Sequence, residues 1–80
     1  MKPISFTPTA TRQWIKLPSA VRQRINGKIE IFATDGRGDV KRLKGRDGCR
    51  LRVGDYRVIF IENIDSIIVV AVGHRREIYD

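Results

Sequence analysis

Hydrophobic residues alternate with polar ones only briefly at the start of the chain and then recur at helical spacing. Ile4 and Phe6 flank a serine, which predicts a short strand. Thr7 and Pro8 favour a helix start, because threonine caps a helix and proline at the first helical position loses no needed donor. Two apolar stripes follow and predict an αα-hairpin that is interrupted at Pro18. The stripes are Ala10, Trp14 and Leu17, then Val21, Ile25, Ile29 and Phe32.

The second half of the chain predicts three strands joined by tight turns. A polar segment at 34–39 is expected to be a loop, and 40–45 a basic connector. The strands and turns are expected at 49–53, 54–55, 56–61, 62–65 and 66–72. Because 66–72 is apolar throughout, it is expected near the centre of the sheet. The predicted fold is α+β in the order β-α-α-β-β-β: a small antiparallel sheet with an N-terminal αα-hairpin packed on one face, as a single domain over 1–80.

An excess of lysine and arginine over carboxylates gives the 80-residue chain a net charge of +7. Charge of this sign attracts polyanions, such as nucleic acid, an anionic membrane or an acidic protein. No apolar run reaches the ~18–20 residues that span a bilayer, and the N-terminus lacks the apolar core of a signal peptide. One cysteine and one histidine supply neither an internal disulfide nor an ordinary zinc site. We therefore expect a cytoplasmic protein that uses no metal or other cofactor and no membrane.

Arginines interrupt the apolar pattern of the predicted sheet. Side chains alternate across a strand, so Arg50 and Arg52 share one face. Arg57 joins them if the apolar residues of the same two strands face the helices. These apolar residues are Leu51, Val53, Val58 and Phe60. Like charges so placed repel one another, and a large anion would relieve the repulsion.

Arg50, Arg52 and Arg57 form a row of side chains on this face. If the chain stays extended towards the C-terminus, the row continues there and His74 points to the opposite face. The row would add Gly73, Arg75, Glu77 and Tyr79, with open space beside the glycine. A solvated surface, on which each arginine pairs with a nearby carboxylate such as Asp55, is the alternative interpretation of this face.

Two stretches, VKRLKGRDGCRLRVGDYRVIF and VAVGHRREIY, carry a more specific pattern. It consists of a leucine-basic-glycine connector, a basic-x-basic strand, Gly-x-Tyr-Arg-Val, and a final Val-Gly-x-Arg that ends in Glu-x-Tyr. In this pattern the sequence resembles the RelE branch of the RelE/ParE toxin superfamily, from bacterial type II toxin–antitoxin systems. The motifs cover about half of the chain, and the element order matches throughout. The resemblance implies a small sheet with a helical hairpin on one face.

The resemblance also implies a ribosome-dependent mRNA endonuclease, or mRNA interferase, that enters the ribosomal A site and cuts the codon presented there. The expected partners are therefore the ribosome, its mRNA and a cognate antitoxin protein. In the reaction of this family, the ribose 2′-hydroxyl attacks the neighbouring phosphate without a metal ion. Such a reaction needs a base for the hydroxyl, an acid for the leaving 5′-oxygen and positive charge around the phosphate.

Carried over residue by residue, the resemblance proposes five catalytic positions. Arg57 and Arg75 match the active-site arginines of the family, and Tyr79 matches its terminal tyrosine. Arg50 and Arg52 fall where the family has a basic-x-basic pair, often of lysines. Because a guanidinium does not give up its proton, we expect these arginines to hold phosphate rather than to act as a base. Tyr79 is then expected to be the base, since nearby cations favour phenolate, or to stack on a base of the codon.

Three further residues are expected to contact RNA. His74 occupies a position that is often basic in the family and is a reserve proton carrier, while Arg42 and Lys44 would bind the RNA backbone or ribosomal RNA. Many relatives continue into a C-terminal helix, whereas this chain ends at Asp80. We therefore expect Tyr79 to be ordered only by RNA or the ribosome.

Two other functions fit a similar fold. A ParE-type toxin inhibits DNA gyrase without enzymatic activity, and a degenerate homologue would keep only antitoxin binding. A gyrase inhibitor does not need the set of Arg50, Arg52, Arg57, Arg75 and Tyr79. This set is therefore the feature that favours the nuclease.

Overall fold

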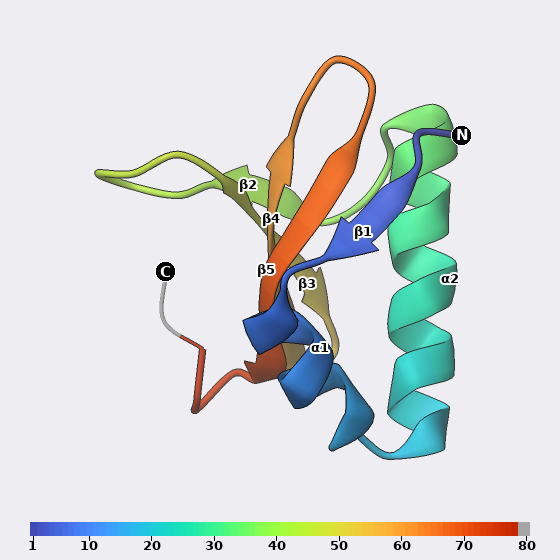
Figure 1. The fold of residues 1–80 in the computed structure, drawn as a ribbon, viewed down its shortest axis with the longest axis vertical. Helices are drawn as coiled ribbons and strands as arrows, with labels where there is room; N and C mark the ends of the chain where they lie inside the picture. The colour runs from blue at the N-terminus through green and yellow to red at the C-terminus, as the bar shows by residue number, and fades with distance from the viewer. Residues whose placement is uncertain (79–80) are drawn as a thin grey trace.

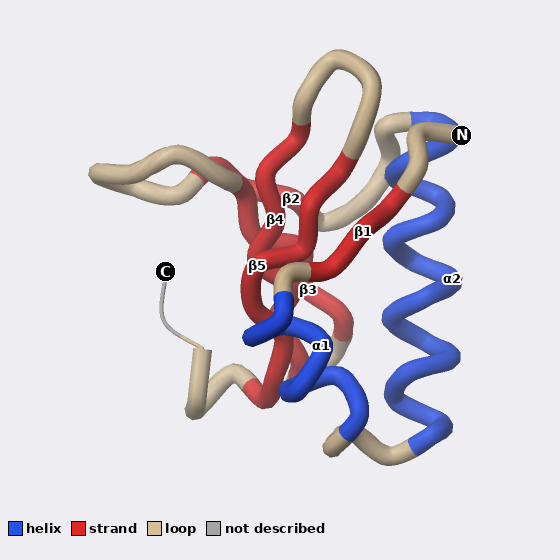
Figure 2. The backbone as a smooth tube through the Cα atoms, viewed as in Figure 1, coloured by secondary structure: helices blue, strands red, loops and turns tan. Residues whose placement is uncertain are grey.

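The computed structural model describes residues 1–78 and shows a five-stranded sheet with two helices on one face (Figures 1 and 2). The elements, in chain order, are β1 (Ile4–Phe6), α1 (Pro8–Ile15), α2 (Ser19–Asp35), β2 (Val40–Arg42), β3 (Cys49–Val53), β4 (Tyr56–Glu62) and β5 (Ile67–His74). The strand order across the sheet is β1-β5-β4-β3-β2. The α+β class, and the order of one strand, two helices and then the remaining strands, agree with the prediction.

One pairing makes the sheet mixed rather than antiparallel, which corrects the prediction. β1 lies parallel to β5, with Ile4 opposite Ile67 and Phe6 opposite Val69, whereas the other pairings are antiparallel. The alternation of a three-residue strand indicates which side chains share a face, but it carries no information about strand direction. β5 has a neighbouring strand on each side, as expected from its apolar sequence.

The basic connector between the helices and the hairpin contains a further strand. Residues 40–42 form β2 at the edge of the sheet, where Lys41 lies opposite Arg50. Charged side chains are common on edge strands because they discourage pairing with other chains. In this segment they replace the apolar alternation by which a strand is predicted, so the strand was not predicted from the sequence. α2 is also longer than expected. It runs to Asp35 and ends at Gly36, whose φ of 71° closes the helix in the left-handed conformation.

The helices cover the face of the sheet that was predicted to carry the core. The prediction is confirmed for Leu51, Val53, Val58 and Phe60, which are buried and pack with apolar residues of both helices. The Thr7 hydroxyl caps α1 by accepting the Ala10 N–H at 3.2 Å. The rings of Phe6 and Trp14 then pack together with centroids 5.2 Å apart. These contacts fix the helical hairpin on one face and leave the arginines of β3 and β4 on the other.

This second face is not fully open to solvent. An apolar cluster of Leu43, Ile59 and Ile78 lies on it, and each of these residues is at most 9% exposed. Ile59 belongs to β4, whereas Leu43 follows β2 and Ile78 is the last described residue. A β-carbon on Gly73 would lie 3.2 Å from Cγ1 of Ile78, so the space expected beside this glycine is filled. The arginines therefore border an apolar patch rather than an empty face.

Candidate nucleic-acid interface

Two of the predicted arginines lie directly opposite each other on the face that the helices leave uncovered. In the register of β3 and β4, Arg52 pairs with Arg57, and Arg50 pairs with Ile59. Since paired residues in antiparallel strands point to the same face, the three arginines share it, as the alternation predicts. Like charges directly opposite each other are destabilising, so the arrangement needs a compensating partner.

The β3–β4 turn fixes two of the arginines that were expected to be catalytic. Arg57 donates from Nη1 to the carbonyl oxygens of Gly54 and Tyr56, each at 2.9 Å. The backbone N–H of Arg75 donates to the carbonyl oxygen of Asp55 at 2.8 Å, and its Nε lies 3.9 Å from the Asp55 carboxylate. The turn thus brings together one arginine from β4 and one from the segment after β5.

A third guanidinium reaches this turn from α2. A β-carbon built on Gly54 would lie 2.6 Å from Nη2 of Arg24. Arg24 was not among the candidates from the sequence, because a charged residue on the polar side of a helix gives no sign of what the helix packs against. The glycine allows this close approach and also supplies the positive φ of 57° that the turn requires.

Gly54→Ala is expected to destabilise the protein by about 1–2 kcal/mol, because that is the cost of a left-handed conformation for an L-residue. The added methyl group would also displace Arg24. For a domain of this size, each kcal/mol lowers Tm by about 4–8 °C, which thermal unfolding by circular dichroism would detect. The matched control is Gly27→Ala within α2, where the new methyl group would meet no atom within 4 Å apart from the neighbouring backbone of its own helix, and Tm should rise. An unchanged Tm in Gly54→Ala would contradict this account of the turn.

The extended row does not continue beyond β5, which corrects the prediction for the C-terminus. The carbonyl oxygen of His74 accepts the N–H groups of Glu77 and Ile78 at 2.8 and 3.2 Å, so the chain turns immediately after the strand. The turn occurs where β4 begins and its ladder with β5 ends, and it places Ile78 in a buried position against Gly73. Tyr79, the expected base, lies outside the described residues.

Two of the arginines have acidic neighbours at the surface. Nε of Arg52 lies 3.9 Å from the Asp39 carboxylate, the same separation as between Arg75 and Asp55. All four side chains are more than half exposed, and pairs of this kind contribute about 0–1 kcal/mol to stability. The solvated-surface interpretation thus holds in part for Arg52 and Arg75. Such weak pairs leave the arginines available to a phosphate group.

A hollow of about 370 Å³ on the same side of the molecule is lined by Lys41, Arg42, Lys44 and Arg50. Arg42 and Lys44, which were expected to bind RNA, therefore meet Arg50, which was expected to be catalytic. Lys41 was missed because β2 was not predicted, and only the pairing of β2 with β3 places it opposite Arg50. A hollow with basic residues on every side suits a polyanion.

His74 lies apart from this basic hollow, on the helix face of the sheet. It is opposite Tyr56 in the register of β4 and β5, and the two rings meet edge to face with centroids 5.5 Å apart. Its Nδ1 accepts the backbone N–H of Arg76 at 3.2 Å. Its expected position off the arginine row is confirmed, but the structure does not bring His74 together with Arg42 and Lys44.

The interface offers guanidinium and ammonium groups, which suit phosphate oxygens. Across residues 1–78, no group of three or more His, Cys, Asp or Glu side chains is placed to hold a metal ion. In the same part of the chain, no helix has the length and the apolar character needed to cross a membrane.

Comparison with known proteins identifies the family. Residues 4–79 match the model described as the ParE toxin of the type II toxin–antitoxin system, parDE. The chain belongs to this family. The match spans all seven helices and strands described above, so the toxin fold accounts for the whole sheet and the helical hairpin.

The most similar relatives place the chain in the RelE branch of the RelE/ParE superfamily. It is 35% identical to Toxin RelE3 of Methanocaldococcus jannaschii, over 96% of this chain and 94% of the relative. It is 29% identical to the mRNA interferase toxin RelE of Escherichia coli K12, over 95% of this chain and 87% of the relative. The RelB–RelE antitoxin–toxin complex from Methanococcus jannaschii superimposes with a TM-score of 0.75 at 34% identity, over 94% of both chains. The resemblance inferred from the sequence motifs is confirmed.

Proposed function

We propose that this RelE-branch chain is the toxin of a type II toxin–antitoxin system and acts as a ribosome-dependent mRNA endonuclease. The observation that carries the proposal is the gathering of Arg52, Arg57 and Arg75 around one turn, on the side of the molecule that also has the basic hollow. The E. coli relative is named an mRNA interferase, which supports the same activity here.

The proposed reaction follows from what these groups offer a phosphate. The 2′-oxygen attacks the adjacent phosphorus and the bond to the 5′-oxygen breaks, which leaves a 2′,3′-cyclic phosphate. The 5′-oxygen takes a proton from water and becomes a 5′-hydroxyl. Arg57 and Arg75 would stabilise the charge that builds on the phosphoryl oxygens. Arg50 and Arg52 would hold flanking phosphates, and Tyr79 would take the proton from the 2′-hydroxyl or stack on a base. Because the nucleophile belongs to the substrate, the proposed mechanism assigns no step to a metal ion.

The proposed partners are a small antitoxin protein, the ribosome and its mRNA, and the proposed compartment is the cytoplasm. The archaeal relative was solved as an antitoxin–toxin complex, which supports an antitoxin for this chain. We expect the antitoxin to wrap the basic face and the helices, so that bound antitoxin and bound RNA exclude each other.

In vitro translation of a defined message, with primer-extension mapping of any cut, tests the activity. Wild-type protein should cut within the codon in the A site and should leave the same message intact when ribosomes are omitted. The description of the family model as a ParE toxin gives the alternative, inhibition of DNA gyrase, a specific basis. A DNA supercoiling assay run in parallel separates mRNA cleavage from gyrase inhibition. Inhibited gyrase together with an uncut message supports the ParE-type function. Antitoxin binding without either effect would indicate a degenerate homologue.

Binding of the isolated protein to single-stranded RNA is expected to weaken steeply as salt rises, because bound phosphates release their counterions. If each of the four residues lining the basic hollow neutralises one phosphate, the plot of log K against log salt concentration has a slope of about −3. Lys44→Ala should reduce this slope by about 0.7, as measured by fluorescence anisotropy. Lys28→Ala, on the exposed part of α2, is the matched control and should leave the slope unchanged. A flat dependence in the wild type would contradict phosphate binding by this hollow.

A further inference from the structure

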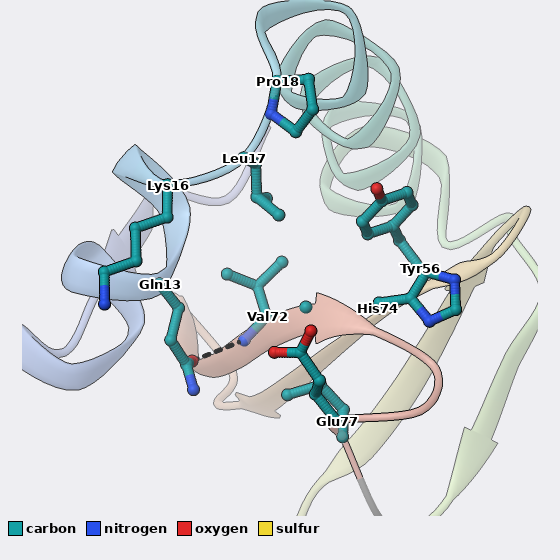
Figure 3. A pocket seen from close by; sticks show the side chains of 10 residues that line it. Gln13, Lys16, Leu17, Pro18, Tyr56, Val72, His74 and Glu77 are labelled. Carbon is teal, nitrogen blue, oxygen red and sulfur yellow. Dashed lines mark hydrogen bonds between the residues drawn. The ribbon is translucent and has the colours of Figure 1, made fainter.

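A second hollow, of about 420 Å³, lies on the helix face of the sheet, between the end of α1 and the ends of β4 and β5 (Figure 3). Its size falls within the ~300–1,000 Å³ range of sites that hold small ligands. None of the arginines discussed above lines it. The hollow is therefore a separate feature from the basic face, and its chemistry is different.

Part of the wall of this hollow is aromatic or aliphatic. The Tyr56 ring lies on one side and the Leu17 side chain on the other, with Val72 below Leu17 (Figure 3). Tyr56 is half-buried against the core and meets the His74 ring edge to face, which limits the movement of both rings. Val72 is held in turn, because its N–H donates to Oε1 of Gln13 from α1 at 2.9 Å. Unpaired bases stack on aromatic walls of this kind.

The remaining wall supplies a hydrogen-bond acceptor. Lys16 at the end of α1 and Glu77 in the turn after β5 both line the hollow, and the Glu77 carboxylate points into it (Figure 3). Among the described residues, neither side chain takes part in an ion pair. The ammonium of Lys16 is directed away from the hollow, whereas the Glu77 carboxylate is available to accept a hydrogen bond from a ligand (Figure 3). Every nucleobase carries a hydrogen-bond donor on its edge.

The sheet connects this hollow to the arginines. Tyr56 directly precedes Arg57 and His74 directly precedes Arg75, so neighbouring residues serve the two features. Since successive side chains of a strand point to opposite faces, Tyr56 faces the hollow while Arg57 faces the basic side at the same end of the sheet. An RNA strand that crosses this end of the sheet could place a phosphate at the arginines and an adjacent base in the hollow.

We infer that this hollow is a nucleobase-binding pocket, which receives an unpaired base next to the cut and sets the sequence preference of the nuclease. Tyr56 stacks on the base, the His74 ring holds the Tyr56 ring in place edge to face, and Glu77 selects the edge of the base. The inference rests on the proposed function, because it assumes an RNA substrate. An antitoxin segment is the competing occupant, and the experiments below separate the two.

Cleavage of messages that differ only in the nucleotide on the 5′ or the 3′ side of the cut provides the first test. Wild type should prefer one base at one of these positions. Tyr56→Leu keeps an apolar side chain against the core but removes the aromatic face, and it should reduce the ratio of best to worst base by about 5- to 100-fold, the effect of one lost stacking contact. Tyr56→Phe keeps the ring and should keep most of the preference, whereas Glu77→Gln should change which base is preferred. Gln23→Ala, which lines a different hollow, should leave the preference unchanged. An unaltered base preference in all of the pocket variants overturns the inference. If the same variants also bind the antitoxin more weakly, the occupant of the hollow is an antitoxin segment.

NMR titration of the isolated protein gives a readout that does not depend on cleavage. The ring protons of His74 and Tyr56 should shift saturably with at least one of the four nucleoside 5′-monophosphates, and ribose 5-phosphate should leave them unmoved. Equal shifts with ribose 5-phosphate would identify a phosphate site and overturn the inference, as would the absence of shifts with all four nucleotides. If base-specific shifts occur but the wild type cuts no message, the proposed function fails while the pocket stands.

Discussion

Arg57→Ala is expected to lower single-turnover cleavage on programmed ribosomes by about 10²–10³-fold, the usual effect of removing one donor that stabilises an anionic transition state. Arg57 is the best placed of the arginines for this role. It lies opposite Arg52, and its bonds to Gly54 and Tyr56 hold its guanidinium in place before substrate binds. Arg57→Lys keeps the charge but loses the planar fork of donors, so we expect it to recover only part of the rate.

The hydrogen bonds of Arg57 also mean that its loss will reduce stability, by about 1–3 kcal/mol for a charged donor. Cleavage must therefore be measured below the melting temperature of the variant. Gly54→Ala is a matched control, because it disturbs the same turn and leaves Arg57 in the chain. Arg75→Ala separates the two effects further. Its side chain is 55% exposed and its acidic partner is 3.9 Å away, so it should lose cleavage with little change in stability. If Gly54→Ala abolished cleavage as fully as Arg57→Ala, Arg57 would act only through the turn.

Tyr79→Phe is expected to reduce cleavage by about 10²–10⁴-fold, the contribution of a positioned general base. The substitution keeps the ring and removes only the hydroxyl group. The last described residue, Ile78, is buried on the same face of the sheet as Arg57. Only the phenolate form of tyrosine can accept a proton, and the fraction of phenolate grows with pH. We therefore expect wild-type cleavage to rise with pH, and Tyr79→Phe to lose this rise.

A comparison of two variants distinguishes a base from a stacking platform. If Tyr79 only stacks on a codon base, Tyr79→Phe should keep most of the activity, while Tyr79→Ala loses the equivalent of about 1–3 kcal/mol. Rates from single-turnover cleavage, measured for both variants across a range of pH, supply the comparison. Full activity in Tyr79→Ala would exclude both roles. Proton transfer would then fall to groups of the RNA and the ribosome, because His74 lies on the face of the sheet opposite Arg57.

The faces of the central strands could be predicted from the sequence because alternation is a local rule. The rule correctly placed Leu51 and Phe60 under the helices and Arg50 and Arg57 on the opposite face. It failed after His74, where it assumed that the chain stays extended. Extension requires a partner strand, and the ladder between β4 and β5 ends at the pairing of Tyr56 with His74. Nothing in the local sequence shows where a partner strand begins.

The sequence by itself determined the two helices, the β3–β4 hairpin and the strong positive charge, since periods of 3.6 and 2 residues and the positions of proline and glycine are properties of short segments. Only the tertiary structure decided the features that join distant segments. These are the parallel pairing of Ile4 with Ile67, the place of Lys41 beside Arg50, the cluster of Ile59 and Ile78, and the hollow between α1 and the end of the sheet. The physical reason is that such contacts form when buried surfaces match in shape and apolar area. That match depends on the whole packed core and leaves no periodic trace in the chain.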